Sequence, residues 1–246
     1  MTDSLPHAEL APVPLNTTVV GSRILTYSSV ASTNDYALRL GGNGTVIVAD
    51  CQTAGRGRQG RAWHSAPGLG LWFSIAFEEC LNGLGFAAAL AVRDALNRYC
   101  ETALKWPNDL LIGGRKVCGI LVEHRKKTTA IGIGINVHHR QEDFPEELRG
   151  KATSLALSTA LPVDRSRILR EVLTELDKKV MLLQSGGGEA VWREWAEACN
   201  VRGRRIRFGG NEGRVLDIDA AGALCVETAA GLRRLVSGEI TMIDGE

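Results

Sequence analysis

Arginine and glycine alternate in the stretch CQTAGRGRQGRAW, which runs from Cys51 to Trp63. The arginines are Arg56, Arg58 and Arg61, and the glycines are Gly55, Gly57 and Gly60. Guanidinium groups carry forks of N–H donors that match phosphate and carboxylate oxygens, and glycine lets backbone approach a ligand closely. The ring of Trp63 offers a stacking surface for a nucleobase. The pattern predicts a loop that folds over an anionic, nucleotide-bearing ligand, although an exposed basic loop or an RNA-contacting segment has the same composition.

A lysine stands inside an apolar hairpin in a second stretch, LKWPNDLLIGGRKVCGILVEH at 104–124. Two short apolar runs joined by Gly113 and Gly114 predict the hairpin. It places Asn108 and Asp109 at one strand entry and Lys116 on the returning strand. An ammonium group is costly to bury without a partner. Lys116 is therefore a candidate ligand-binding residue, and the alternative is a lysine on the solvent side of the strand.

Polar residues at element ends supply further candidates. Ser32, Thr33 and Asn34 stand at the start of an expected helix, where they cap the helix or present hydroxyl and amide groups to a polar ligand. Asn136 ends a strand interrupted by glycines, a pattern that often marks close backbone approach to a ligand. The adjacent pair at 138–139 has no metal-ligand spacing, and we interpret these histidines as part of a solvated loop.

The composition is that of one ordinary domain with a small appendage. The chain has 246 residues, 44% hydrophobic and 23% charged, as in soluble globular proteins. A formal net charge of +1 gives no overall indication of nucleic acid or a membrane as partner. No apolar run reaches the roughly 20 residues that span a bilayer, and the N-terminus has no signal-peptide pattern. Six scattered cysteines without a C-x-x-C pair predict neither disulfides nor structural zinc, so we expect a reduced, cytoplasmic protein.

Hydrophobic periodicity predicts strands and helices in alternation, and then a run of short strands. We expect strands at 19–27, 45–50, 68–78 and 129–137, a short helix from 32 or 33 to 40, helices at 83–100, 165–184 and 189–200, and a polar connection at 138–156. Asp164 is the expected N-cap of the helix at 165–184. Four or five short strands in about 45 residues after Val201 predict a small β-barrel of SH3 type. We divide the chain into a loose lead-in at 1–18, a domain at 19–200 and a domain at 201–246.

Four of these motifs together resemble the biotin protein ligases. They are STN at 32–34, QTAGRGRQGRAW at 52–63, KWPNDLLIGGRKVCGILVE at 105–123 and GIGIN at 132–136, in family order and spacing. The closing LVSGEITMI resembles the C-terminal domain of that family. The resemblance implies an α/β fold of the α+β type, with a mixed-sheet catalytic domain of the biotin/lipoate ligase type followed by an SH3-like β-barrel.

The resemblance also implies a ligase that uses ATP. Members join biotin to ATP, giving biotinyl-5′-adenylate and pyrophosphate, and transfer the biotinyl group to one lysine of a carrier. A biotin carboxyl carrier domain of acetyl-CoA carboxylase is the implied partner. Mg²⁺ is expected with the triphosphate, since phosphates and one or two carboxylates usually hold it.

Residue roles follow from the same resemblance. The implied catalytic residues are Lys116, between the biotin carboxylate and the α-phosphate, with Arg58 and Asp109, and Asp109 would orient or deprotonate the acceptor lysine. The residues expected around biotin are Ser32, Thr33, Asn34, Gln52, Gly55, Arg56, Lys116 and Gly119. Those expected around ATP or the adenylate are Arg58, Arg61, Trp63, Asn108, Lys116 and Asn136. No residue is assigned to a metal.

Two departures and two rival functions accompany this interpretation. Cys118 stands where family members often carry alanine, and the N-terminal DNA-binding module of the bifunctional repressor-ligases is missing, so we expect a monofunctional ligase that binds no DNA. The oligomeric state varies in the family and includes homodimers.

A lipoate or octanoate ligase or transferase shares the fold, but the full GRGRQGRAW loop and the SH3-like tail favour biotin. An RNA-binding module is disfavoured by the net charge and by the lack of an RRM-like or KH-like signature.

Overall fold

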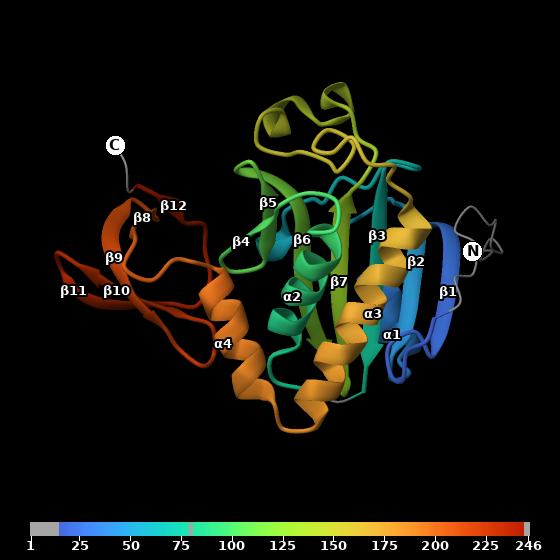
Figure 1. Cartoon of the computed structure of the whole chain (residues 1–246), viewed down its shortest axis with the longest axis horizontal. Helices are drawn as coiled ribbons and strands as arrows, with labels where there is room; N and C mark the ends of the chain where they lie inside the picture. Colours follow the sequence, from blue (N-terminus) through green and yellow to red (C-terminus); the bar gives the residue numbers. More distant parts are fainter. Residues whose placement is uncertain (1–14, 79–80, 244–246) are drawn as a thin grey trace.

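The structure of the chain is a computed structural model that describes residues 15–78 and 81–243 (Figure 1). Within these residues, seven strands form one mixed sheet in the order β1-β2-β3-β7-β6-β5-β4. Their bounds are β1 (Arg23–Val30), β2 (Thr45–Gln52), β3 (Gly70–Phe77), β4 (Ala103–Lys105), β5 (Asp109–Ile112), β6 (Arg115–Arg125) and β7 (Thr128–Asn136). β1 and β2 are parallel, and the other neighbouring strands are antiparallel.

Helices cover both faces of this sheet. They are α1 (Thr33–Leu40), α2 (Leu84–Leu96), α3 (Arg165–Gln184) and α4 (Gly188–Ala198). In Figure 1, α2 and α3 lie in front of the sheet and α1 lies behind it. Ala37 of α1 packs on Ile47, Ala76 and Ala130 of the sheet, whereas α2 and α3 belong to the larger core on the other face. Because β3 is covered on both faces, all its residues are buried, which explains its almost uninterrupted apolar sequence.

A second sheet follows α4 and packs against the first domain. It is antiparallel, in the order β11-β10-β9-β8-β12, and comprises β8 (Arg205–Phe208), β9 (Asn211–Ile218), β10 (Leu224–Thr228), β11 (Gly231–Leu235) and β12 (Thr241–Met242). The indole of Trp106 donates a 2.8 Å hydrogen bond to the carbonyl of Gly222, and the indole of Trp192 donates one of 2.8 Å to the backbone carbonyl of Asp219. These contacts fix the second sheet beside the end of the first, where its segment at 238–239 reaches the cavity described below.

Most expected elements are confirmed, and Asp164 caps α3 by accepting a 2.7 Å hydrogen bond from the backbone N–H of Arg167. The first strand was placed wrongly: it runs over 23–30 and not 19–27. The backbone N–H groups of Thr18, Val19 and Val20 donate to the buried carboxylate of Asp177 on α3, at 2.7–2.8 Å, and are therefore unavailable to the sheet. The short strand β4 was not predicted, and residues 1–14 of the expected lead-in lie outside the described residues.

Replacing Asp177 by alanine should destabilise the fold by about 2–4 kcal/mol, because three backbone donors lose a charged acceptor. Equilibrium urea unfolding measures the change. Asp177→Asn keeps one oxygen as acceptor, so its free energy of unfolding should lie between those of the wild-type protein and Asp177→Ala. Arg170→Ala, at an exposed position of the same helix, serves as control. A loss no larger than that of the control would mean that these three hydrogen bonds contribute nothing measurable to stability.

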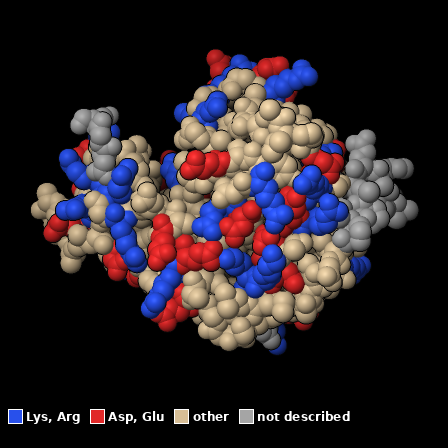
Figure 2. All heavy atoms as spheres, in the orientation of Figure 1, with Lys and Arg blue, Asp and Glu red and all other residues tan. Residues whose placement is uncertain are grey.

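Charged side chains of both signs are mixed on one face of the molecule. On the face shown in Figure 2, acidic and basic side chains alternate over the helices without a large patch of one sign. Among the described helices, none is long and apolar enough to cross a membrane.

Candidate active site

One cavity of about 760 Å³ brings the four motifs together. It lies between the start of α1, the Gly/Arg loop after β2, the β5–β6 hairpin, β7 and the segments 148–152 and 238–239. The predicted residues that line it are Ser32, Thr33, Asn34, Gln52, Arg56, Arg58, Arg61, Trp63, Asn108, Asp109, Lys116, Gly119 and Asn136. Gly55 is the predicted site residue that does not line the cavity. It is buried inside the loop, where a Cβ would lie 2.6 Å from the carbonyl oxygen of Trp63.

A β-bulge in the hairpin determines which side chains of β6 reach the cavity. The register between β5 and β6 shifts between Leu110 and Leu111, so that Leu110 pairs with Cys118 and Leu111 with Lys116. In a regular strand, residues three positions apart point to opposite faces. The extra residue, Val117, resets this alternation. Lys116 and Gly119 therefore both line the cavity, while Val117 and Cys118 are both buried.

Lys116 stands among groups that fix its position. Its Nζ lies 2.7 Å from Oδ1 of Asp109 and 5.1 Å from the ring centre of Trp63. Nearby, Arg58 donates a 3.0 Å hydrogen bond to Oδ1 of Asn108, whose amide nitrogen donates to the carbonyl of Ile120. Partial burial lowers the pKa of Arg58, with Asp109 opposing the shift, and the group stays protonated at neutral pH. Two cations and one carboxylate of the cavity lining are thus held in place by neighbouring side chains.

The indole of Trp63 packs directly against the backbone of two paired glycines. Gly119 of β6 and Gly134 of β7 are directly paired, and a Cβ on either one would meet the Trp63 ring at 2.5–3.1 Å. The loop reaches this position by folding back on itself, with a 2.9 Å hydrogen bond from Trp63 N to the carbonyl of Gly55. Glycines in such strands often let a ligand approach the backbone closely. Here the group that approaches the backbone of Gly119 and Gly134 is the Trp63 side chain of the same protein.

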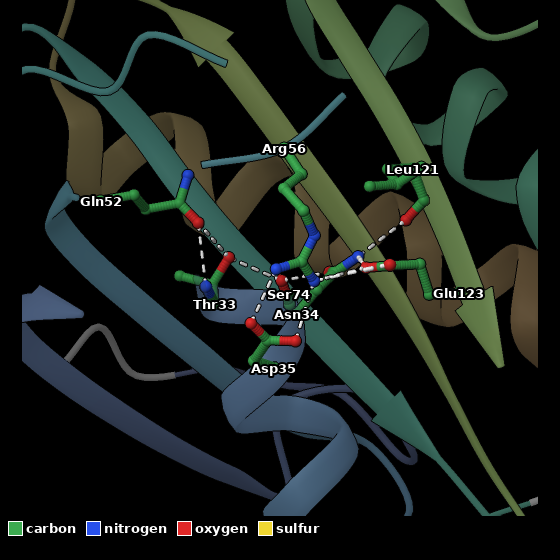
Figure 3. A network of polar contacts seen from close by, with 8 residues as sticks. All are labelled: Thr33, Asn34, Asp35, Gln52, Arg56, Ser74, Leu121 and Glu123. Atoms are coloured by element: carbon green, nitrogen blue, oxygen red, sulfur yellow. Dashed lines mark hydrogen bonds and ion pairs between the residues drawn. The ribbon is translucent and has the colours of Figure 1, made fainter. Parts of the chain in front are cut away.

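Polar groups at the start of α1 bind one another (Figure 3). Oε1 of Gln52 accepts from the backbone N–H and the hydroxyl of Thr33, at 2.8 and 3.0 Å. The hydroxyl of Ser74 lies 2.7 Å from that of Thr33 and 2.6 Å from Oδ1 of Asn34. Ser32 has the backbone conformation of an N-cap, but its side chain makes no capping hydrogen bond. The network holds Thr33, Asn34 and Gln52 in fixed orientations along the cavity wall.

Arg56 is bound by two carboxylates in the same region (Figure 3). It donates to both oxygens of Asp35 at 2.8 Å, and its second contact is Glu123 at 3.4 Å. The Arg56 guanidinium holds the pKa of the Asp35 carboxyl below its usual value. Glu123 also accepts a 2.7 Å hydrogen bond from the amide of Asn34. This arginine is consequently less available to an anionic ligand than its place in the motif suggests.

Two other predicted residues have partners within the chain. Arg61 forms an ion pair with Glu239 of the second sheet domain, and both side chains are exposed. The amide of Asn136 donates to the carbonyls of Thr153, at 3.0 Å, and Lys116, at 3.4 Å. Asn136 therefore holds the strand that carries the lysine against the segment that follows β7.

The interpretation of both histidines at 138–139 as solvated was wrong for His139. Its side chain is 1% exposed and lines the cavity. The ring stacks on Phe144, with centroids 4.8 Å apart, and meets the edge of Trp72 at 5.9 Å. Burial lowers the pKa of His139 to about 4, so the ring is neutral at neutral pH.

The cavity is strongly basic although the chain is nearly neutral. Among the described residues that line it, six are lysine or arginine and two, Asp109 and Glu239, are carboxylates. The described residues contain no cluster of three or more histidine, cysteine or acidic side chains that could hold a metal ion. Burial raises the pKa of the Cys118 thiol, so this cysteine is no thiolate nucleophile at neutral pH. This balance of charge in the lining favours an anionic ligand.

Sequence reasoning missed four residues that shape the site: Asp35, Ser74, Glu123 and Glu239. Ser74 lies within the apolar run of β3, where a serine gives no signal of its own. Asp35 and Glu123 bind Arg56 from elements far apart in the sequence. Glu239 belongs to the SGEI segment that had been used only to identify the second domain.

Comparisons with known proteins agree on one family. Residues 26–139 match the biotin/lipoate A/B protein ligase family, and residues 201–242 match the biotin protein ligase C terminal domain. The biotin--[acetyl-CoA-carboxylase] ligase of Paracoccus denitrificans is 39% identical over 230 residues, which cover 85% of this chain and 96% of that protein. The bifunctional ligase/repressor BirA of Bacillus spizizenii is 35% identical over 249 residues, which cover 93% of this chain and 76% of that protein.

Solved structures give the same result for the fold. The biotin protein ligase from Aquifex aeolicus, in complex with biotin and ATP, is 30% identical with a TM-score of 0.77. The likeness covers 90% of this chain and 99% of that one, so it includes the large mixed sheet and the C-terminal sheet.

Proposed function

This chain belongs to the biotin protein ligase family, and from that premise we propose that its cavity binds biotin and ATP end to end and joins them. The protein is a biotin--[acetyl-CoA-carboxylase] ligase, which attaches biotin to the carrier of that carboxylase. The observation that supports the arrangement best is the convergence of the sequence motifs on one basic cavity.

Strand β7 gives the cavity a direction. A Cβ at Gly132 would collide with the amide of Asn34, and one at Gly134 would collide with Trp63, while Asn136 contacts the backbone of Lys116. Four residues of strand span roughly 13 Å, at about 3.3 Å each. We assign the polar end, with Ser32, Thr33, Asn34 and Gln52, to the fused rings of biotin. The opposite end, beyond Asn136, is left for the nucleoside.

Lys116 and Arg58 act where the two ligands meet. An oxygen of the biotin carboxylate attacks the α-phosphorus, the bond from that phosphorus to the bridging oxygen breaks, and pyrophosphate leaves. Both reactants are anionic, so the approach requires positive charge fixed in advance. Lys116 Nζ, held by Asp109, and Arg58, held by Asn108, supply that charge. No enzyme nucleophile is required, which agrees with the protonated state of Cys118.

The remaining loop residues close the site over the ligands. Trp63 rests on the pair of glycines at 119 and 134 and packs along the bound adenylate from that side. Arg61 faces the β- and γ-phosphates once it leaves Glu239. Gly55 and Arg56 shape the loop, because one is enclosed by it and the other ties it to Asp35 and Glu123.

Mg²⁺ enters with the triphosphate in this proposal. The lining offers two carboxylates, Asp109 and Glu239, among the described residues, too few for a cage made of protein alone. That set fits an ion held chiefly by phosphate oxygens. Bound there, Mg²⁺ neutralises phosphate charge. Since ATP is a cellular cosubstrate and the cysteines described are unpaired, we place the reaction in the cytoplasm.

ATP-dependent incorporation of labelled biotin into a purified carrier domain tests the function. Biotin should enter one lysine of the carrier, and a tenfold excess of lipoate should not suppress it. Transfer of lipoate in place of biotin would keep the fold and overturn the substrate.

A further inference from the structure

Two carboxylates bind Arg56 without lining the cavity themselves. Two nitrogens of its guanidinium donate to the two oxygens of Asp35, both at 2.8 Å, and Glu123 lies 3.4 Å from one of them (Figure 3). Among the described residues, the lining includes Arg56 but neither carboxylate. Asp35, Arg56 and Glu123 thus form a clamp, and the two carboxylates can affect a bound ligand only through another residue.

The carboxylates of the clamp come from different elements. Asp35 lies in the first turn of α1, and Glu123 lies on β6, where it also accepts a 2.7 Å hydrogen bond from Asn34. Arg56 therefore ties the loop to both elements. The side chains of the clamp are 30–38% exposed, so solvent screens their attraction less than that of a fully exposed pair. The two short hydrogen bonds to Asp35 should hold Arg56 more tightly than the longer contact with Glu123.

The Gly/Arg loop at 52–63 transmits this anchoring because its two arms pair with each other. Arg56 forms an antiparallel bridge with Ala62, and the backbone N–H of Trp63 donates a 2.9 Å hydrogen bond to the carbonyl of Gly55. Fixing Arg56 on the first arm therefore also fixes the returning arm, which carries Trp63.

The first arm passes directly over the polar wall of the cavity. A Cβ on Gly55 would lie 2.9 Å from Oγ of Ser65 and 3.1 Å from Nε2 of Gln52. Oε1 of the same Gln52 accepts from Thr33. The proposed function assigns this wall to the fused rings of biotin, so the arm held by the clamp covers that end of the ligand.

We propose that Asp35, and to a smaller extent Glu123, are positioning residues that hold the Gly/Arg loop over the site and slow the escape of biotinyl-5′-adenylate between the two half-reactions. The inference rests on the proposed function and deepens it. Lys116 and Arg58 are held by other side chains, so the chemical step should not depend on the clamp. The expected signature is faster release of the ligand at an unchanged kcat.

A chase experiment measures the release. Labelled adenylate is formed on the protein from biotin and ATP, excess unlabelled biotinyl-5′-adenylate is added, and the label that stays bound is followed in time. Asp35→Ala should release the adenylate about tenfold faster than the wild-type protein, the value of one charge-assisted hydrogen bond. In biotin-dependent pyrophosphate exchange, this variant should raise the KM for biotin and leave kcat within about twofold. Asp35→Glu keeps the charge and should retain most of the slow release.

A double-mutant comparison tests whether Asp35 acts through Arg56. If it does, the variant that combines Asp35→Ala with Arg56→Ala should release the adenylate no faster than Arg56→Ala alone. Glu123→Gln should speed release by only about threefold, as expected for the weaker contact. Asp217→Ala breaks an exposed 2.7 Å ion pair with Arg202 in the second sheet, and this matched control should leave release unchanged.

Release at the wild-type rate in Asp35→Ala would overturn the inference, and so would additive effects in the double variant. A loss of kcat as large as the gain in release would also overturn it, because the substitution would then disturb the whole site. Thermal unfolding reports whether each variant is folded. If Asp35→Ala does not fold, Asp35→Asn replaces it, and because it keeps one oxygen for Arg56 it should speed release by about threefold. Failure of the wild-type protein to exchange pyrophosphate in the presence of biotin would instead overturn the proposed function.

Discussion

Lys116→Ala should reduce the rate of adenylate formation by about a thousandfold, while the protein stays folded. Removing one preorganised donor from a site of charge development costs on the order of 10² to 10³ in rate. In the wild-type protein, the Asp109 carboxylate lies 2.7 Å from Nζ of Lys116. The substitution removes this positive partner and leaves the carboxylate of Asp109 unpaired with Lys116 beside the incoming biotin carboxylate. The second effect repels the substrate and adds to the first, so the expected loss lies at the upper end.

Biotin-dependent exchange of labelled pyrophosphate into ATP measures this half-reaction without the carrier. Lys116→Arg keeps a positive charge and should retain part of the rate, although a guanidinium does not reproduce the position of Nζ. Lys127→Ala changes an exposed lysine in the turn after β6 and serves as control. Near-normal exchange in Lys116→Ala would remove Lys116 from the reaction and leave Arg58 as the principal cation.

The sequence indicated which residues meet at the site but not how the hairpin presents them. The types and spacing around Lys116 predicted a hairpin with a ligand-binding lysine. Simple alternation, however, would have placed Lys116 and Gly119 on opposite faces of β6. The bulge at Val117 that reconciles them depends on pairing with β5, which no local pattern reveals.

Burial and long-range pairing account for the other differences. His139 was misassigned because Trp72, far away in the sequence, and Phe144 enclose it. Thr18, Val19 and Val20 have good strand propensity, yet Asp177, more than 150 residues later, takes their backbone donors. Arg56 lines the cavity and stays a predicted ligand contact, but nothing in the sequence indicated that its guanidinium is also bound by both oxygens of Asp35.

Asp109→Asn should separate the two half-reactions. The amide keeps an oxygen that can hold Lys116, so adenylate formation should fall by no more than about tenfold. Transfer from preformed biotinyl-5′-adenylate to the carrier should fall by about a hundredfold, the usual contribution of a general base. The reason is that the acceptor lysine enters protonated and its amine attacks the acyl carbon only after losing a proton, which we propose that Asp109 accepts as AMP leaves.

Single-turnover transfer from isolated adenylate measures the second step directly. Glu147→Gln, an exposed carboxylate in the turn at 146–148, is the control for loss of one negative charge. Unchanged transfer in Asp109→Asn would mean that solvent or the carrier takes the proton and that Asp109 only holds Lys116. Equal losses in both half-reactions would lead to the same conclusion, since misplacing Lys116 affects both. Only a loss confined mainly to transfer identifies Asp109 as the base. If Asp109 acted only by holding Lys116 through the 2.7 Å contact, adenylate formation would fall more than transfer.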